Sequence, residues 1–493
     1  MPALEFDFNN MFSFSIGRQH GVTVEELESS RKTVQKAHRH LMSIMKEPDN
    51  RVKLGLEWTK LPFQDKKIIR EIQRLGKEIS EGYENIIFLG IGGSYLGLKA
   101  AQDALRSPYH NETAFIRGRV PRIYFEGNNL DPEPLSALMK ALDPKKTFVV
   151  VISKSGETTE TKASFQVIEN WLKKGAGTKY GRQIFAITDP ASGSLRQRVN
   201  EEQRKDPLSF RSLPLLKGVG GRFSELNMGL LHLAIIGIEI DKVLEGAKVM
   251  SERCNRGNLY KNPACMYAVL HHILYRKKGK SIAIMMPFSE TLKSTADWYV
   301  QLLAESLGKK YRRKVRISPS GIEAWENDKT HALNAARTPI SSRGTNDLHS
   351  IQQNNIEGEN NKAVTFIRVS KFKNDIRIPK TNSQDGFLEG RAFSRLITLA
   401  HEATEWALVR EKRPNCTVTM PEVSPYYWGG LIFFFEMATA FEGELLNVNA
   451  FDQPGVESYK NYMYYKLHKS GIDEAIADEI RSNPLVKKKG FIV

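Results

Sequence analysis

Residues 153–161 combine small hydroxylated side chains with one lysine. They read Ser-Lys-Ser-Gly-Glu-Thr-Thr-Glu-Thr, so five hydroxyl-bearing residues lie within nine. The stretch follows an apolar run at 149–152 and precedes an amphipathic one at 163–168, which predicts a strand, a loop and the start of a helix. Backbone N–H groups at a helix N-terminus suit a phosphate, whereas an ordinary cap needs fewer hydroxyls. We therefore predict a loop that binds a phosphoester, with a simple helix cap as the alternative.

A glycine-rich stretch at 90–97 reads Gly-Ile-Gly-Gly-Ser-Tyr-Leu-Gly. It joins a predicted strand at 86–89 to a predicted helix at 94–105. The dinucleotide-binding pattern G-x-G-x-x-G requires glycine where Tyr95 stands, which argues against a nicotinamide dehydrogenase. The glycines instead allow backbone N–H groups to approach a small ligand, with Ser94 as the helix cap.

A second glycine-rich turn, at 218–224, carries Arg222 in the sequence Gly-Val-Gly-Gly-Arg-Phe-Ser. A planar guanidinium that is always charged is suited to stabilising an oxyanion on a substrate. The alternative is a turn whose arginine pairs with a neighbouring carboxylate. The residues alone leave both interpretations open.

Glu305 lies near the end of a predicted helix at 294–307, which Gly308 is expected to stop. Its distance of four residues from Lys309 is that of an ordinary surface ion pair, and spacing alone favours that reading. Against it, the neighbours of Glu305 are apolar, namely Leu302, Leu303, Ala304 and Leu307. A carboxylate partly removed from water there is suited to acting as a general base.

Two further segments carry candidate groups. His349 lies beside Asp347 and Ser350 in a predicted loop, which suits an acid or base. Gln453 and Lys460 follow a turn that contains Pro454, and their separation of seven places both on one face if the segment is helical.

Alternating strand and helix patterns predict the elements that position these groups. One set of strands is expected at 86–89, 122–125, 149–152 and 184–187, and another at 281–286, 315–317, 363–367 and 416–419. Such alternation predicts an α/β fold with two doubly wound parallel sheets, whose ligands lie beyond the carboxyl ends of the strands. We predict a helical N-terminal extension at 1–80, α/β domains at 81–240 and 241–445, and a helical tail at 446–493.

Composition narrows the class of protein. The chain has 493 residues, 41% of them hydrophobic and 26% charged, which is typical of a globular protein of several domains. The net charge is +16 and concentrated in short basic runs, but no nucleic-acid-binding motif accompanies them, so we expect no nucleic-acid partner. Three scattered cysteines predict a reducing compartment. We expect a cytoplasmic protein with no membrane partner, because no leader and no spanning apolar segment is seen.

The motifs together resemble the glucose-6-phosphate isomerase (phosphoglucose isomerase) family. They occur in the family's order over residues 90–460: the glycine run at 90–97, Ser-Lys-Ser-Gly-Glu-Thr-Thr-Glu-Thr, Gly-Gly-Arg-Phe-Ser, Glu-Ser-x-Gly-Lys, Asp-Leu-His-Ser and Phe-Asp-Gln-Pro-Gly-Val-Glu-x-x-Lys. The resemblance implies two tandem sugar-isomerase (SIS) domains, each an αβα sandwich. It also implies reversible isomerisation of glucose 6-phosphate and fructose 6-phosphate through ring opening and a cis-enediolate.

The resemblance also implies a role for each candidate residue. The phosphate cradle would consist of Ser153, Lys154, Ser155 and Thr158, and the sugar would be lined by Gly93 and Ser94. The base that moves a proton between C1 and C2 would be Glu305, and the enediolate would be stabilised by Arg222. The ring would be opened by His349 and Lys460, and Gln453 would help to bind the sugar. No metal and no cofactor are implied, because Arg222 supplies the electrostatic stabilisation. In the family the histidine reaches the site from the partner subunit, so a homodimer is implied.

The chain departs from the family's pattern in places. Lys217 stands where an acidic or small polar residue is usual, the run after Arg222 is one residue shorter, and Asp347-Leu348 replaces Gly-Gln. None of these changes removes a chemical group. Two alternatives remain: an isomerase that also accepts mannose 6-phosphate, and a sugar-phosphate-binding regulator, which would have no use for Glu305.

Overall fold

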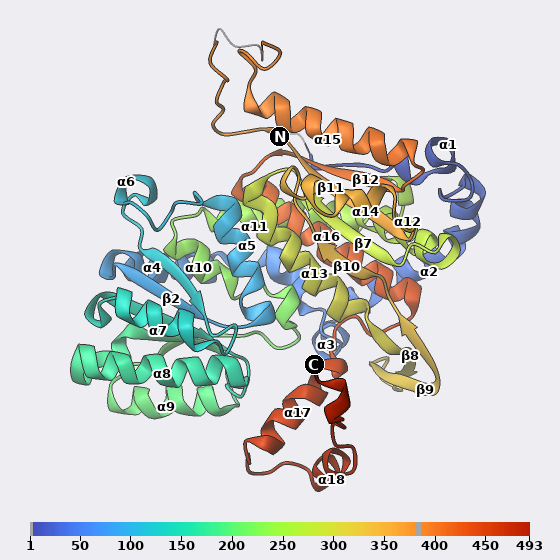
Figure 1. The fold of residues 1–493 in the computed structure, drawn as a ribbon. Coiled ribbons are helices and arrows are strands. Elements are labelled where there is room, and N and C mark those ends of the chain that lie inside the picture. The colour runs from blue at the N-terminus through green and yellow to red at the C-terminus, as the bar shows by residue number, and fades with distance from the viewer. Residues whose placement is uncertain (1–2, 381–385) are drawn as a thin grey trace. The chain divides into compact units, whose positions relative to one another are not determined.

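The computed structural model describes residues 3–380 and 386–493. Contacts between residues divide the chain into two compact units, Met1–Ala450 and Phe451–Val493. The larger unit holds two five-stranded sheets and one two-stranded sheet, as Figure 1 shows. The domain limits predicted at 80, 240 and 445 stay predictions.

The first sheet contains five strands, all paired in parallel. They are β2 (Asn85–Leu89), β3 (Arg122–Glu126), β4 (Thr147–Ile152), β5 (Ile184–Thr188) and β6 (Arg211–Pro214), in the order β3-β2-β4-β5-β6. Strands β2, β4 and β5 are buried along their whole length. Helices cover both faces of such a sheet, which is why these strands appear in the sequence as continuous apolar runs.

Helices alternate with these strands. They are α4 (Lys66–Gly82), α5 (Leu96–Leu105), α6 (Ala114–Arg117), α7 (Pro132–Ala141), α8 (Thr159–Ala176), α9 (Ser194–Lys205) and α10 (Gly229–Ile235). The predicted helical cap at Ser94 is wrong, because Gly92–Ser94 forms a 3-10 turn and α5 begins at Leu96. The glycines at 90–93 allow this tighter turn between the strand and the helix.

The second sheet repeats the strand order of the first. Its parallel strands are β7 (Ile282–Pro287), β10 (Thr338–Ser341), β11 (Lys362–Lys371) and β12 (Asn415–Glu422), and β1 (Glu5–Asp7) pairs antiparallel with β12 at the edge. The order is β1-β12-β11-β7-β10. In both sheets the order therefore reverses at one point, between β2 and β4 in the first and between β7 and β11 in the second. Ligands of such sheets bind beyond the carboxyl ends at this point.

Two predictions about this half are wrong. Residues 315–317 belong to β8 (Lys309–Ile317), which pairs with β9 (Glu323–Ala335) in a separate antiparallel hairpin. The many exposed lysine and arginine side chains of β8 suit a two-stranded ribbon better than a buried sheet. The N-terminal extension is not only helical, because β1 joins the second sheet.

Long helices pack around the second sheet. They are α2 (Val24–Lys46), α11 (Ile240–Cys254), α12 (Pro263–Lys278), α13 (Lys293–Leu307), α15 (Phe393–Arg410) and α16 (Pro425–Leu446), with the short helices α1 (Ser13–Ile16), α3 (Pro48–Lys53) and α14 (Gln352–Ile356) between them. Helix α16 is buried along most of its length and packs against α11, α12 and α13. It also contacts α5, so it links the two halves of the larger unit.

The smaller unit contains two short helices, as predicted. They are α17 (Glu457–Lys466) and α18 (Glu474–Ser482), preceded by a 3-10 turn at Pro454–Val456. Among the described residues, no helix combines the length and the apolar character needed to cross a bilayer.

Candidate active site

The glycine loop after β2 packs directly against the turn that carries Arg222. A methyl group added at Gly93 would lie 2.3 Å from the carbonyl carbon of Gly221 and 2.7 Å from the backbone nitrogen of Arg222. At Gly92, where φ is +57°, it would lie 2.8 Å from the side-chain nitrogen of Gln301 on α13. Only glycine permits these approaches, so the loop joins the first sheet to the Arg222 turn and α13.

Arg222 is buried, with 2% of its surface exposed, and hydrogen bonds to several segments of the chain fix its guanidinium. Nε donates to the hydroxyl of Ser306 at 2.8 Å, Nη2 to the backbone carbonyl of Ala450 at 2.8 Å, and Nη1 to Oε2 of Glu305 at 3.3 Å. The sequence left open whether this arginine pairs with a carboxylate or faces a substrate. It does pair with a carboxylate, and that carboxylate is the predicted base.

Glu305 keeps part of its carboxylate open to solvent, with 29% of the side chain exposed. Besides Arg222, it accepts a hydrogen bond at Oε1 from the amide of Gln301 at 3.2 Å. Lys309 is buried and donates to the backbone carbonyl of Glu305 at 2.7 Å. The buried position of Lys309 therefore excludes the exposed surface ion pair that the spacing suggested. Gly308 ends the helix, as predicted.

The loop at 153–158 presents its groups at the carboxyl end of β4. The hydroxyl of Ser153 accepts a hydrogen bond from the backbone N–H of Gly156 at 3.0 Å, and the hydroxyl of Ser155 accepts one from that of Glu157 at 3.1 Å. The side chain of Thr158, at the N-cap of α8, makes no capping hydrogen bond. The first backbone N–H groups of this long helix thus have no side-chain cap within the described chain, which favours an anion site over an ordinary cap.

A chain of short contacts connects this loop to Glu305. Strand β4 lies beside β2, so their carboxyl ends meet at one edge. Gly127, which follows β3, contacts both segments: its carbonyl accepts a hydrogen bond from the hydroxyl of Thr161 at 3.2 Å, and a methyl group on it would lie 3.4 Å from the backbone nitrogen of Gly90. From Gly90 the glycine loop leads to Arg222 and Glu305. The structure therefore brings together Gly93, Ser94, Arg222, Glu305 and the hydroxyl-rich loop.

The other predicted residues lie elsewhere or in the second unit. His349 ends an exposed 3-10 turn, Asn346–His349, after β10, and its ring has no hydrogen-bond partner among the described residues. Gln453 precedes the turn at Pro454–Val456, and Lys460 lies on α17, where it donates to Glu457 at 2.9 Å. The helix expected around Lys460 is present, but the roles of these residues stay predictions.

Sequence reasoning missed two residues that hold this site in place. Gln301 and Ser306 both lie on α13, and they bind the carboxylate of Glu305 and the guanidinium of Arg222. Gln301 lies one helical turn before Glu305, so helical spacing could have indicated it. Ser306 has no such signal, because its partner is distant in the sequence.

A pair of buried carboxyl groups lies behind the Arg222 turn. Glu225 and Glu436 are 1% and 2% exposed, and the indole N–H of Trp298 donates to Oε1 of Glu225 at 2.7 Å. A methyl group on Gly97 would lie 2.4 Å from Cγ of Glu225. Burial raises the pKa of both carboxyl groups, and the adjacent Glu225 raises that of Glu436 further. A proton held between them supplies the donor that Oε2 of Glu225 otherwise lacks among the described residues.

This pair makes stability depend on pH. Both groups bind protons more tightly in the folded state than in the unfolded chain, whose glutamates titrate near 4.5. The contribution of this pair to stability is therefore complete below that pH and falls as pH rises, by about 1.4 kcal/mol per pH unit for each proton retained on folding. We expect the pair to add to the pH dependence of the melting temperature a component that falls as pH rises above about 5, and Glu225→Gln to remove part of that component in calorimetry. Glu71→Gln, on the exposed face of α4, is the matched control, and an equal loss there would contradict the prediction.

Comparison with known proteins identifies the family. The model of the phosphoglucose isomerase family matches residues 73–479. A glucose-6-phosphate isomerase from Carboxydothermus hydrogenoformans is 37% identical over 476 residues, which is 96% of each chain. One from Symbiobacterium thermophilum is 35% identical over 426 residues, covering 85% of this chain and 88% of that one.

Solved structures agree with this result. A hypothetical protein from Thermus thermophilus superposes with a TM-score of 0.79 at 31% identity, over 94% of this chain and 99% of that one. A glucose-6-phosphate isomerase from Chlamydia trachomatis gives 0.70 at 20% identity, over 94% of this chain and 90% of that one, which supports the fold alone. The predicted α/β class and the resemblance are both confirmed, and the chain belongs to the phosphoglucose isomerase family.

Proposed function

We propose that the groups described above carry out the family's reaction, the interconversion of glucose 6-phosphate and fructose 6-phosphate. The observation that carries this assignment is the 3.3 Å contact between Arg222 and Glu305, which Gly127 and the glycine loop connect to the hydroxyl-rich loop. A base and a fixed cation at one place are what an enediolate intermediate requires. The scheme invokes neither a metal nor a cofactor.

The first step holds and opens the sugar. Lys154, Ser155 and Thr158 bind the phosphate together with the backbone N–H groups that begin α8. Gly93 and Ser94 line the sugar chain, and Ser153 belongs to the same phosphate cradle, where its hydroxyl also accepts a hydrogen bond from the backbone N–H of Gly156 at 3.0 Å. His349 and Lys460 move the protons that convert the ring to the open-chain aldose, and Gln453 helps to bind it.

The second step transfers a proton between two carbons. Glu305 removes the proton from C2 of the open-chain aldose, the C1–C2 bond becomes double, and the carbonyl oxygen on C1 takes up negative charge. Arg222 stabilises that oxyanion. The protonated Glu305 then returns the proton to C1, and the hydroxyl proton on O2 moves to O1, which leaves the ketose.

A coupled assay tests the function. Fructose 6-phosphate is supplied, and the glucose 6-phosphate formed is oxidised by an added dehydrogenase whose reduced nicotinamide is followed by absorbance. We expect rapid turnover with fructose 6-phosphate, and mannose 6-phosphate is assayed beside it. Tight binding of fructose 6-phosphate without turnover would indicate a regulator instead, and turnover of both sugars an isomerase of broader specificity.

Removing the lysine of the phosphate loop should weaken binding more than turnover. We expect Lys154→Ala to raise KM for fructose 6-phosphate by about tenfold to a hundredfold, because a charge-assisted hydrogen bond contributes about 1.5 to 3 kcal/mol. The value of kcat should change far less, since the phosphate is bound equally in the ground and transition states. Lys174→Ala, at the far end of α8, is the control. A fall in kcat with KM unchanged would contradict the loop's assignment.

The proposal includes a homodimer in which each site takes His349 from the partner subunit. Glu305→Gln and His349→Ala chains, each inactive alone, would then restore activity when mixed, because a mixed dimer contains one site with neither change. Random exchange of subunits predicts about a quarter of the wild-type activity. Absence of any recovery after confirmed exchange would place His349 in its own chain's site.

We also propose a cytoplasmic location. The three cysteines, Cys254, Cys265 and Cys416, are buried and form no disulfide, as is usual in a reducing compartment.

A further inference from the structure

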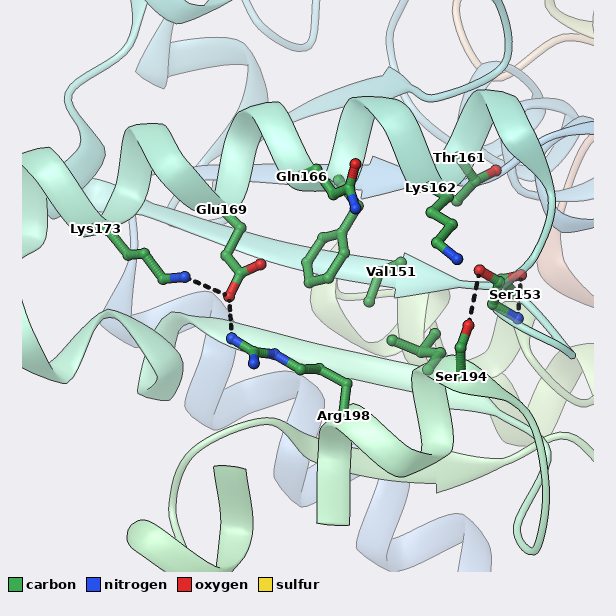
Figure 2. Close-up of a pocket in the computed structure, with 12 residues that line it drawn as sticks. Val151, Ser153, Thr161, Lys162, Gln166, Glu169, Lys173, Ser194 and Arg198 are labelled. Atoms are coloured by element: carbon green, nitrogen blue, oxygen red, sulfur yellow. Dashed lines mark hydrogen bonds and ion pairs between the residues drawn. The ribbon is translucent and has the colours of Figure 1, made fainter. Parts of the chain in front are cut away.

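A cavity of about 410 Å³ lies beneath the phosphate loop, between α8 and α9. Its size is within the range of sites that bind small organic molecules. Figure 2 shows its lining, with Val151 at the end of β4 forming part of the floor. Lys154, Ser155, Thr158, Arg222 and Glu305 do not line it. The cavity shares Ser153, Gly156 and Thr161 with the hydroxyl-rich loop, and Ser153 is also assigned to the phosphate cradle, but its other lining residues are not among the groups that we assign to the substrate.

The middle of the cavity is apolar. Phe165 from α8 and Leu195 from α9 contribute to it together with Val151, and all three belong to the core cluster of the first sheet. A sugar phosphate presents a hydroxyl on almost every carbon and would lose hydrogen bonds to water there. A flat apolar ring makes no hydrogen bonds to water and would lose none in the cavity. The cavity thus suits a ligand of a different class from the substrate.

The charged groups of the cavity favour an anion. Lys162, Lys173 and Arg198 are cationic, and Glu169 is the acid among the residues that line it. Figure 2 shows Glu169 between two of these cations, Arg198 at 2.8 Å and Lys173 at 3.2 Å. The carboxylate of Glu169 is nearly buried, at 11% exposure, while the side chain of Lys162 is 42% exposed.

The ammonium of Lys162 points toward Ser153 and Ser194 at the other end of the cavity. Lys162 also pairs with Glu157 at 3.2 Å, but Glu157 does not line the cavity. An ammonium has three N–H donors, so this one ion pair leaves Lys162 able to donate to an anion inside the cavity as well.

The cavity wall is bonded to the phosphate loop. The backbone N–H of Ser194 donates to the carbonyl of Ser155 at 2.9 Å, and its hydroxyl donates to the carbonyl of Gly156 at 3.2 Å. A methyl group on Gly156 would lie 2.5 Å from the backbone nitrogen of Leu195. Because the two segments are this close, a ligand that moves Ser194 or Leu195 must also move the loop.

We propose that this cavity is a second ligand site, which binds a small organic anion with an apolar ring and changes the affinity of the phosphate loop for the substrate. The ring lies on Phe165, Val151 and Leu195, and the anionic group meets Lys162 beside Ser153 and Ser194. The effect on the substrate rests on the proposed isomerase function, whereas binding of the anion does not.

Equilibrium dialysis with 1-anilinonaphthalene-8-sulfonate, an aromatic anion, tests the site. We expect one dye to bind per chain and to stay bound in saturating fructose 6-phosphate. Gln166→Trp covers the opening from α8 and should abolish binding, while Val167→Trp, exposed on the same helix but outside the cavity, should not. Lys162→Met should weaken binding by about fivefold or more. Displacement of the dye by fructose 6-phosphate, or equal binding to Gln166→Trp and the wild type, would overturn the proposal.

The coupling is measured separately. Saturating dye should shift the KM for fructose 6-phosphate in the wild type and in Val167→Trp, but not in Gln166→Trp. Bound dye with an unchanged KM in the wild type would remove the effect on the substrate and leave a binding site only. Absence of turnover in every variant would instead count against the proposed function, so the two failures are distinguishable.

Discussion

Replacing Glu305 with glutamine is expected to lower kcat for fructose 6-phosphate by about a thousandfold or more, while KM changes by less than about threefold. A positioned general base contributes about a hundredfold to ten-thousandfold to a rate, and an amide cannot accept the proton from carbon. The amide oxygen can still accept the hydrogen bond that Arg222 donates at 3.3 Å. The shape of the site and the contacts to the phosphate loop are therefore retained. A coupled assay, with substrate affinity measured independently by calorimetry, separates the two quantities.

Two controls make this result specific. Glu290→Gln changes an exposed carboxylate in the 3-10 turn Glu290–Leu292 before α13, where it pairs with Arg343 at 3.1 Å, and should leave both constants unchanged. Exchange of a C1 proton of fructose 6-phosphate with solvent should also disappear in Glu305→Gln, because turnover and exchange require the same base. Wild-type turnover in Glu305→Gln would end the assignment of the base.

Burial on both faces explains which strands the sequence predicted. Strands such as β4 and β5 are entirely enclosed by helices and form continuous apolar runs. Strands β1, β6 and β10 lie at sheet edges and are short. An edge strand buries little surface of its own, so β6, which reads Arg-Ser-Leu-Pro, carries no local signal. The strand predicted at 315–317 was assigned to the wrong sheet because its local sequence does not show its partner. Only its pairing with β9 places it outside the second sheet.

The site likewise contains parts that the local sequence predicts and parts that depend on contacts between distant residues. The loops at 90–97 and 153–161 were predictable because glycines and hydroxyls at a strand-to-helix junction have a local physical meaning. The contacts that fix Arg222 were not, since Ser306 and Ala450 are 84 and 228 residues away in the sequence. The pairing of Glu225 with Glu436 is likewise a product of packing between α16 and the Arg222 turn. Tertiary contacts of this kind have no periodicity to detect.

Replacing Arg222 with lysine is expected to lower kcat by about a hundredfold to a thousandfold, which is the usual cost of losing one preorganised group that stabilises an oxyanion. The charge is kept, so a loss of this size would show that geometry matters. The guanidinium reaches Ser306, Ala450 and Glu305 at once. A single ammonium on a flexible stem cannot do so. Lysine would leave some of these partners without a donor and would not hold the charge opposite the enediolate.

A merely structural role for Arg222 predicts a different outcome, and chemical rescue distinguishes the two. Arg222→Ala leaves a cavity in place of the side chain of a residue that was 2% exposed, and millimolar guanidinium can enter that cavity. If the cation itself stabilises the intermediate, guanidinium should restore kcat in Arg222→Ala by about tenfold or more, while the melting temperature stays that of the variant. Arg343→Ala, which pairs with Glu290 at the protein surface, should show neither the loss nor the rescue. If kcat recovers only together with thermal stability, Arg222 has a structural role. Glu305 would then act without a cation that stabilises the negative charge.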